Sequence, residues 1–192
     1  MASPNILVFA ASTRSGSLNQ QLASVVTGRI ERYGGSVTNL DLAKYPLPIY
    51  DGDLEATDGV PAAAIALHEQ LRGHDGIFIA SPEYNSSVGP LLVNLLAWTS
   101  RITAHGGVDA AFGKPVFAIG SASPGGFGGY RGLMALRQIL ELQFMARVLP
   151  AMVSVPSAHT AFDESGQLRN EVSSALVDKI AKSLVALATA EA

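Results

Sequence analysis

The 192-residue chain has a formal net charge of −3, with 48% hydrophobic and only 15% charged residues. This much apolar surface can offset the entropy that a chain loses on folding, so intrinsic disorder is disfavoured. No apolar run approaches the roughly 18 residues of a membrane-spanning helix, and no basic cluster offers a surface for nucleic acid. Because there is no cysteine, disulfides, thiolate nucleophiles and Cys-ligated metals are excluded.

The length is typical of one domain, so we predict a single folded unit over residues 1–192. The first ten residues lack the basic segment and long apolar run of a secretory signal. We therefore expect a soluble, cytoplasmic protein that binds neither a membrane nor nucleic acid, and we predict no metal site.

Strand-like and helix-like segments alternate from the start of the chain. Residues 5–10 form a largely apolar run typical of a buried parallel strand, and apolar residues recur at helical spacing over about 18–34. A second strand is predicted over 36–42. Residues 46–53 are too rich in Pro and Gly for regular structure, and a helix follows over about 61–73.

The rest of the chain continues this alternation, with a predicted strand at 76–80, loop 81–87, helix 89–101, strand 115–120, loop 121–128, helix 129–147, strand 148–155 and a last helix through 172–187. Strands that alternate with helices form a parallel sheet with helices on both faces, because the connections are right-handed. We therefore predict an α/β fold, a flavodoxin-like three-layer sandwich with five parallel strands in the order 2-1-3-4-5.

Three strand-to-helix loops should meet at one edge of this sheet, at residues 11–19, 81–88 and 120–129. Ligands of such folds bind beyond the carboxyl ends of the strands, near the switch between the first and third strands. All three loops are rich in Ser, Gly, Asn or Pro. Such residues also serve as ordinary caps and turns, but three such loops at one edge predict a ligand site.

The first loop places hydroxyl groups and an arginine directly before a helix. Amides at a helix N-terminus favour an anion, Ser12 and Ser17 can donate to its oxygens, and Arg14 can pair with its charge. Ser17 is equally suited to cap the helix, with Gln20 completing a capping box, and the two roles are compatible. Neither a P-loop nor a dinucleotide fingerprint is present, so a mononucleotide phosphate is predicted.

The second loop brings a rigid proline, an aromatic ring and amide groups to the same edge. We expect main-chain groups of residues 83–85 to bond the polar edge of a flat heteroaromatic ligand, while Pro82 and Tyr84 pack near its face or rim. The alternative is that Glu83 is a solvated charge and Tyr84 a packing residue.

The third loop, 120–129, is rich in glycine, which suits a backbone that approaches a ligand closely and donates to a ring carbonyl. The alternative is a mobile surface loop. In the helix at 89–101, the side chains of Asn94, Trp98 and Arg101 share one face. We expect that face to contact a partner subunit or a loop as readily as the ligand.

Two of these segments resemble motifs of the NAD(P)H-dependent FMN reductase family, a flavodoxin-like group of quinone, azo-dye and chromate reductases. The first loop is similar to that family's Gly-Ser-x-Arg-x-x-Ser-x-Asn motif, matched at Ser12, Arg14, Ser17 and Asn19, with Ala11 replacing the glycine. The second is similar to its Pro-Glu-Tyr-Asn motif. The similarity covers nearly the whole chain, including residues 47–50, 136–137 and 162–166.

The resemblance implies bound FMN as the cofactor, NAD(P)H as cosubstrate and ping-pong hydride transfer to a small acceptor: a quinone, azo dye, metal oxyanion or free flavin. It assigns no catalytic side chain, because the chemistry takes place at flavin N5. The cofactor-binding residues it implies are Ser12, Arg14, Ser17, Leu18, Asn19, Pro82, Glu83, Tyr84, Asn85, Ser121, Gly125 and Gly126.

The resemblance also implies a homodimer or homotetramer. The predicted helix at 129–147 supports this because it is apolar nearly all round, although burial within one subunit is an alternative. Val93 and Ala97 stand where the family commonly has a lysine and an acidic residue, so a helix surface is altered. Two rival functions remain: a flavodoxin-type one-electron carrier, disfavoured by Arg14, the modest acidity and the second motif, and a flavin-free binding module.

Overall fold

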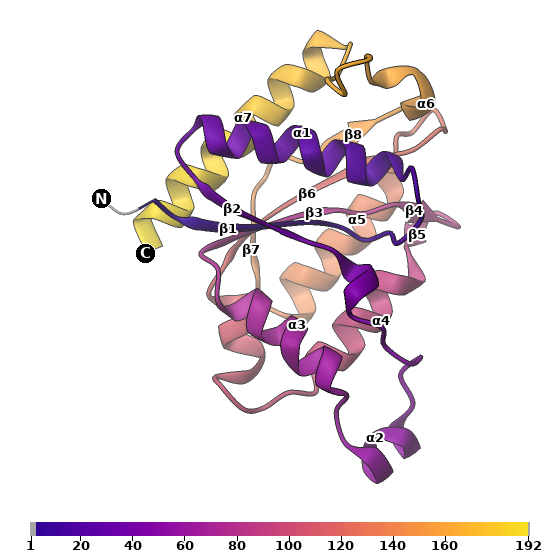
Figure 1. Cartoon of the computed structure of the whole chain (residues 1–192), viewed down its shortest axis with the longest axis vertical. Helices are drawn as coiled ribbons and strands as arrows, with labels where there is room; N and C mark the ends of the chain where they lie inside the picture. Colours follow the sequence, from indigo (N-terminus) through magenta and orange to yellow (C-terminus); the bar gives the residue numbers. More distant parts are fainter. Residues whose placement is uncertain (1–2, 192) are drawn as a thin grey trace.

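The computed structural model describes residues 3–191 and contains a parallel sheet with helices on both faces (Figure 1). The strands are β1 (Asn5–Ala10), β2 (Ser36–Leu40), β3 (Gly76–Ala80), β6 (Val116–Ala122), β7 (Arg147–Val148) and β8 (Val153–Val155). Their order is β2-β1-β3-β6-β7, and β8 also pairs with β6. The predicted order 2-1-3-4-5 is confirmed, with β7 and β8 sharing the fifth position.

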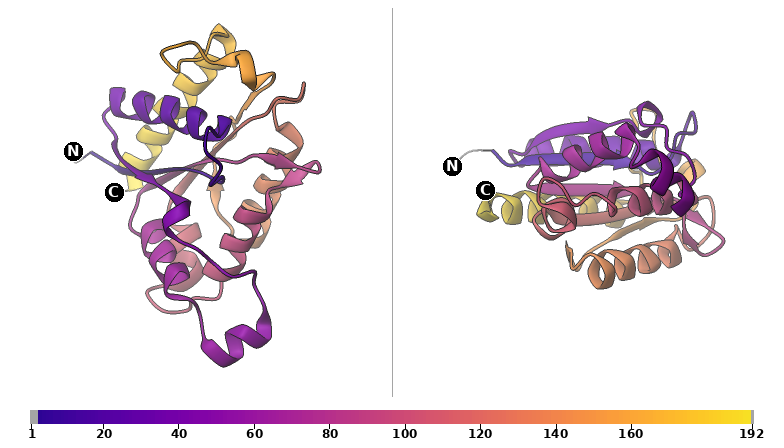
Figure 2. Two further views of the ribbon diagram at one scale, coloured as in Figure 1. Left: turned by 45° about the vertical axis from the view of Figure 1, so that its right-hand side comes forward. Right: turned by 90° about the horizontal axis from the view of Figure 1, so that it is seen from below.

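The two faces of the sheet bury alternate residues of each strand against different helices. Ile6 and Val8 of β1 join the cluster under α1 (Leu18–Arg32) and α7 (Glu171–Glu191). Leu7 and Phe9 join the opposite cluster under α3 (Ala62–Arg72), α4 (Pro90–Thr99) and α5 (Tyr130–Gln138). Figure 2 shows these helices on the two sides of the sheet. Burial on both faces explains why these strands are continuously apolar.

Several smaller elements lie in the connections: η1 (Leu42–Lys44), α2 (Gly52–Asp58), the hairpin β4 (Glu83–Tyr84) and β5 (Ser87–Val88), the π-helical turns η2 (Asp109–Gly113) and η3 (Ile139–Gln143), and α6 (Ala158–Ala161). Residues 46–51 lack regular structure as predicted, but α2 begins at Gly52. This helix projects away from the sheet (Figures 1 and 2) and buries none of its side chains.

The predicted helix at 129–147 and strand at 148–155 are each broken in the structure. Regular helix ends at Gln138, η3 follows, and Met145 has a φ of 52° before β7 begins. The fifth strand is interrupted around Pro150, which has no N–H to offer a sheet ladder. At this interruption the guanidinium of Arg137 donates to the carbonyl of Leu149, at 2.5 Å.

Among the described residues, no helix combines the length and the apolar character needed to cross a membrane.

Candidate functional site

The three predicted loops surround one cavity of about 210 Å³ at the carboxyl ends of β1, β3 and β6. Eight of the residues predicted from the sequence line it: Ser12, Arg14, Ser17, Leu18, Asn19, Pro82, Glu83 and Tyr84. The third loop contributes Ala122, Ser123 and Pro124 instead of the residues expected there. The topology therefore brings together side chains more than a hundred positions apart in the sequence.

Four predicted residues do not line this cavity. Asn85 lies in the turn between β4 and β5, and Gly125 and Gly126 are exposed farther along the third loop. Ser121 is fully buried, and its Oγ has no hydrogen-bond partner among the described residues. The sequence reasoning ended the strand at residue 120, whereas β6 continues to Ala122, so the rim of the cavity begins two residues later than expected.

The first loop forms a helix N-terminus suited to an anion. Ser17 is the N-cap of α1, and its Oγ accepts a hydrogen bond from the amide of Gln20 at 3.4 Å. No acidic residue stands in the first turn, and Arg14 makes no ion pair with any residue that the structure describes. Gln20 does not complete the predicted capping box, because its side chain donates to the carbonyl of Ser12 at 3.3 Å.

Asn19 directs its side-chain amide to the end of β6. Its Nδ2 donates to the carbonyl of Ala122 at 3.0 Å, and its Oδ1 accepts from the amide of Ala122 at 2.9 Å. Asn19 is only 4% exposed. The residue therefore connects the first and third loops directly.

Glu83 connects the second loop to α5. Its carboxylate accepts hydrogen bonds from the amide of Gly132 at 3.0 Å and from the guanidinium of Arg131. The N-cap of α5 is Gly129, which has no side chain, so Glu83 caps this helix from another part of the chain. Burial favours the neutral acid, but the Gly132 amide and the Arg131 guanidinium outweigh it and lower the pKa of Glu83. Glu83 is therefore not the solvated charge of the alternative interpretation, because its carboxylate binds the start of α5.

The second loop is a hairpin, which the sequence reasoning treated as irregular. Glu83 pairs with Val88 and Tyr84 with Ser87, and both residues of the turn, Asn85 and Ser86, have positive φ values. Asparagine tolerates this conformation, so the Asn-Ser pair between short strands was the available signal. The hairpin leaves Tyr84 54% exposed at the cavity. Tyr84 also lines a second cavity, of about 160 Å³, together with Ser12 and Arg14.

The shared face of Asn94, Trp98 and Arg101 contacts a loop, one of the alternatives predicted. The side chains of Asn94 and Trp98 both donate to the carbonyl of Pro48 at 2.8 Å, and Asn94 Oδ1 accepts from the amide of Tyr50. Arg101 pairs with Glu55 at 2.9 Å and is the main cause of that carboxyl's lowered pKa. This face holds the segment that leads to α2.

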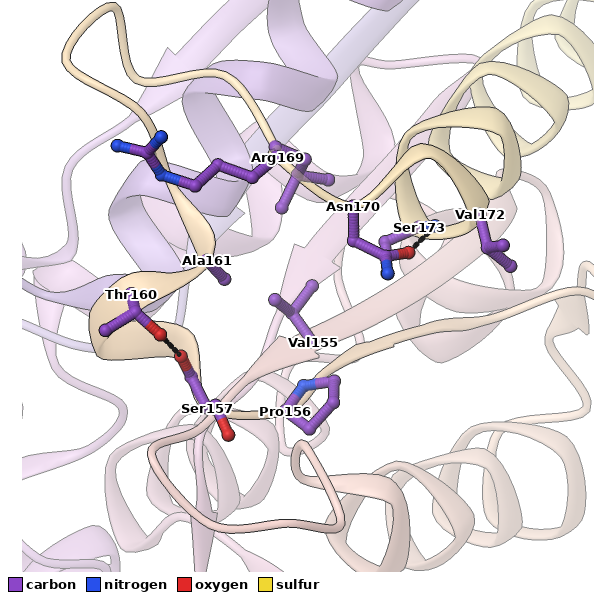
Figure 3. A pocket seen from close by; sticks show the side chains of 10 residues that line it. Val155, Pro156, Ser157, Thr160, Ala161, Arg169, Asn170, Val172 and Ser173 are labelled. Atoms are coloured by element: carbon purple, nitrogen blue, oxygen red, sulfur yellow. Dashed lines mark hydrogen bonds between the residues drawn. The ribbon is translucent and has the colours of Figure 1, made fainter.

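A larger cavity, of about 590 Å³, lies between the end of β8, α6 and the start of α7. Its polar side chains close local turns, as the dashed lines in Figure 3 show: Thr160 donates to the carbonyl of Ser157, and Asn170 accepts from the amide of Ser173. Arg169 donates to the carbonyl of Phe162. By volume alone this cavity would be the candidate ligand site. The cavity of about 210 Å³ is the better candidate, because three strand-end loops converge on it.

The donor set of the smaller cavity fits a phosphate monoester, because two hydroxyls and an arginine adjoin a helix N-terminus without an acidic residue. The strand order is that of a flavodoxin-like fold, and a site of this composition at the strand ends is typical of the proteins of this fold that bind a mononucleotide. A model of the NADPH-dependent FMN reductase family matches residues 4–160. The chain belongs to this family, and it is an oxidoreductase that depends on FMN and NAD(P)H.

Individual relatives agree with this assignment. The NAD(P)H-dependent FMN reductase PA1204 of Pseudomonas aeruginosa is 32% identical over 91% of this chain and 89% of its own. A quinone reductase of Escherichia coli K12 is 37% identical over 70% of this chain and 68% of its own. Among solved structures, the flavoenzyme NAD(P)H:(acceptor) oxidoreductase FerB of Paracoccus denitrificans has the same fold, with a TM-score of 0.74, 22% identity and 98% coverage of both chains.

Proposed function

We propose that the chain binds FMN at the cavity between the three loops and passes electrons from a reduced nicotinamide to a quinone. The observation that carries this proposal is the placement of Ser12, Arg14 and Ser17 at the start of α1, opposite Pro82 and Tyr84 in one cavity. The quinone is inferred from the E. coli relative, which is named a quinone reductase.

The size of the cavity indicates how FMN would lie. Its 210 Å³ is below the about 300 Å³ at the lower end of ligand pockets, so it suits the phosphate and part of the polyol. The ring would extend over the hairpin, where main-chain groups of 83–85 meet its polar edge and Tyr84 its rim. Of the residues implied by the resemblance, Asn85 would then contact the ring through its main chain, whereas Ser121, Gly125 and Gly126 would contact it only if the third loop moves toward it.

Bound flavin supplies the redox chemistry by accepting a hydride and later releasing two electrons. The protein binds and orients the reactants, and no acid or base side chain is required. With the ring between the exposed Tyr84 and the third loop, one open face would serve nicotinamide and quinone in turn, which favours a ping-pong mechanism.

The test of this function uses the purified protein as it is expressed. We expect a flavin absorption spectrum that NADPH bleaches without any partner protein. In double-reciprocal plots of initial rate against NADPH concentration, we expect parallel lines at several benzoquinone concentrations. Intersecting lines would contradict the ping-pong mechanism. A colourless protein that neither takes up FMN nor oxidises nicotinamide would overturn the whole proposal, including the FMN site.

We further propose that the chain forms a homo-oligomer through the surface between α4 and η3. An apolar groove of about 260 Å³ lies there, and Val93 and Ala97, the two departures from the family's common residues, line it. Leu142 and Met145 flank the lining residues Gln143 and Phe144 in the sequence, and their side chains are 74% and 83% exposed. An apolar groove with exposed apolar side chains beside it is typical of a surface that a second copy covers.

A further inference from the structure

The first and third loops of the site are joined by one side chain. Asn19 stands in the first turn of α1 and Ala122 is the last residue of β6, 103 positions away. The two hydrogen bonds between them, at 2.9 and 3.0 Å, pair the donor and the acceptor of the Asn19 amide with the main-chain acceptor and donor of Ala122. The pairing resembles one rung of a β-ladder, formed by a side chain beyond the end of the sheet.

This pairing leaves the Asn19 side chain only one unused N–H and little exposed surface with which to bind a phosphate directly. It is 4% exposed and bonded on both its oxygen and its nitrogen, whereas Arg14 beside it is exposed and Ser12 only half-buried. A buried amide that lost these partners would leave two main-chain groups of Ala122 unsatisfied as well. The contacts therefore favour a structural use of the amide over a ligand contact.

We propose that Asn19 is a positioning residue that holds the phosphate-binding loop at a fixed distance from residues 122–124, rather than a ligand of the phosphate. This inference rests on the proposed FMN site and differs from the phosphate contact that the family motif implies for Asn19. Two loops that are already in place when FMN arrives need no further ordering, so the connection strengthens binding at both ends of the cofactor.

Comparing FMN with riboflavin, which lacks the phosphate, separates the two roles. For Asn19→Leu we expect the dissociation constants of both flavins to rise by similar factors, on the order of tenfold. Ser12→Ala is the matched control: Ser12 lines the cavity at the same loop, and its loss should weaken FMN alone. If Asn19→Leu weakens FMN and leaves riboflavin unchanged, Asn19 binds the phosphate and the proposal is wrong.

A second measurement needs no flavin. In the flavin-free wild-type protein the amide hydrogen of Ala122 should be protected from exchange, because it donates to Asn19 Oδ1. In Asn19→Leu the exchange of the Ala122 amide should become more than about tenfold faster. The amide of Ser81, which donates to the carbonyl of Gly120, should stay protected and serves as the control. An unprotected Ala122 amide in the folded wild type contradicts the proposal even if the variant does not fold.

The two measurements also separate this proposal from the proposed function. If the wild type binds neither flavin, the FMN site is wrong, and Asn19 then has no positioning role in flavin binding. If the wild type binds FMN but the Ala122 amide exchanges freely, the FMN site stands and the role of Asn19 is wrong.

Discussion

At the scale of single residues, Glu83 shows how an acidic side chain in a binding motif can act on the fold. The pKa of Glu83 is lowered in the folded protein, so the carboxylate stabilises the fold above its unfolded pKa of about 4.3. That stabilisation disappears as the pH falls through the folded pKa, because the neutral acid no longer pairs with Arg131.

We predict that Glu83→Gln lowers the free energy of unfolding by about 1 kcal/mol at neutral pH, since Arg131 is half-exposed and its ion pair is partly screened. The difference from wild type should shrink as the pH is lowered below about 4. Urea unfolding at several pH values measures it. The exposed Glu164 provides the control Glu164→Gln, and a Glu83 effect that does not depend on pH would contradict the assigned ion pair.

Arg14 should matter to FMN and little to the fold. We predict that Arg14→Ala weakens FMN binding by about 1.5 to 3 kcal/mol, the range of a hydrogen bond to a charged group, and leaves riboflavin binding unchanged. Fluorescence titration of both flavins tests this. Arg32→Ala, at the other end of α1, is the control. Unchanged FMN affinity in Arg14→Ala would remove Arg14 from the site.

Gly129 is required by its backbone and by its surroundings. Its φ is 87°, and a Cβ there would overlap the hydroxyl of Ser121. We expect Gly129→Ala to lower the free energy of unfolding by at least about 2 kcal/mol, from the left-handed conformation and the overlap together. Gly126→Ala, with nothing within 4 Å and no positive φ, should be close to neutral. Equal thermal denaturation of the two variants would contradict this account.

The site could be predicted from the sequence where a residue's type determines its position, and less well elsewhere. A serine before an apolar helix predicts an N-cap, and Ser17 is one. The partners of Asn19 and Glu83 lie 103 and 48 to 49 positions away, so no local pattern indicates them. The motif placed both residues at the ligand, but it does not say which way their side chains turn.

At the scale of elements, the interruptions were harder to predict than the strands and helices themselves. Buried strands and amphipathic helices repeat one pattern over many residues, and all five strand positions agree with the structure. The hairpin after β3 has only two residues per strand, and η2 and η3 differ from regular helix in hydrogen bonds that span one residue more. Such short features are decided by tertiary contacts, such as Arg137 with the Leu149 carbonyl.

Asn94 of α4 holds the segment of residues 48–50 through hydrogen bonds to Pro48 and Tyr50. We predict that Asn94→Ala removes the bonds to Pro48 and Tyr50, speeds hydrogen exchange over residues 48–58, and lowers stability by about 1 to 2 kcal/mol. Flavin affinity should change little, because Asn94 does not line the cavity. Ser100→Ala is the control, since that hydroxyl bonds only within α4. A large loss of FMN affinity would connect this segment to the site.

At the scale of the whole molecule, the exposed apolar side chains of Leu142, in η3, and Met145, just after it, should decide assembly. We predict that Leu142→Asp combined with Met145→Asp converts the oligomer to a monomer, as measured by light scattering after gel filtration. Val172→Asp, on α7 over the opposite face of the sheet and 77% exposed, should leave the mass unchanged. A monomeric wild type would overturn the proposed oligomer.

The interruption of the fifth strand also bears on aggregation through the edge of the sheet. A long, flat strand at the edge of a sheet exposes a row of unpaired main-chain groups on which another chain can add. Here that edge consists of two residues of β7 and three of β8, separated by a turn at Pro150. Neither piece is long enough to template a further strand, so the interruption protects this edge against aggregation between sheets.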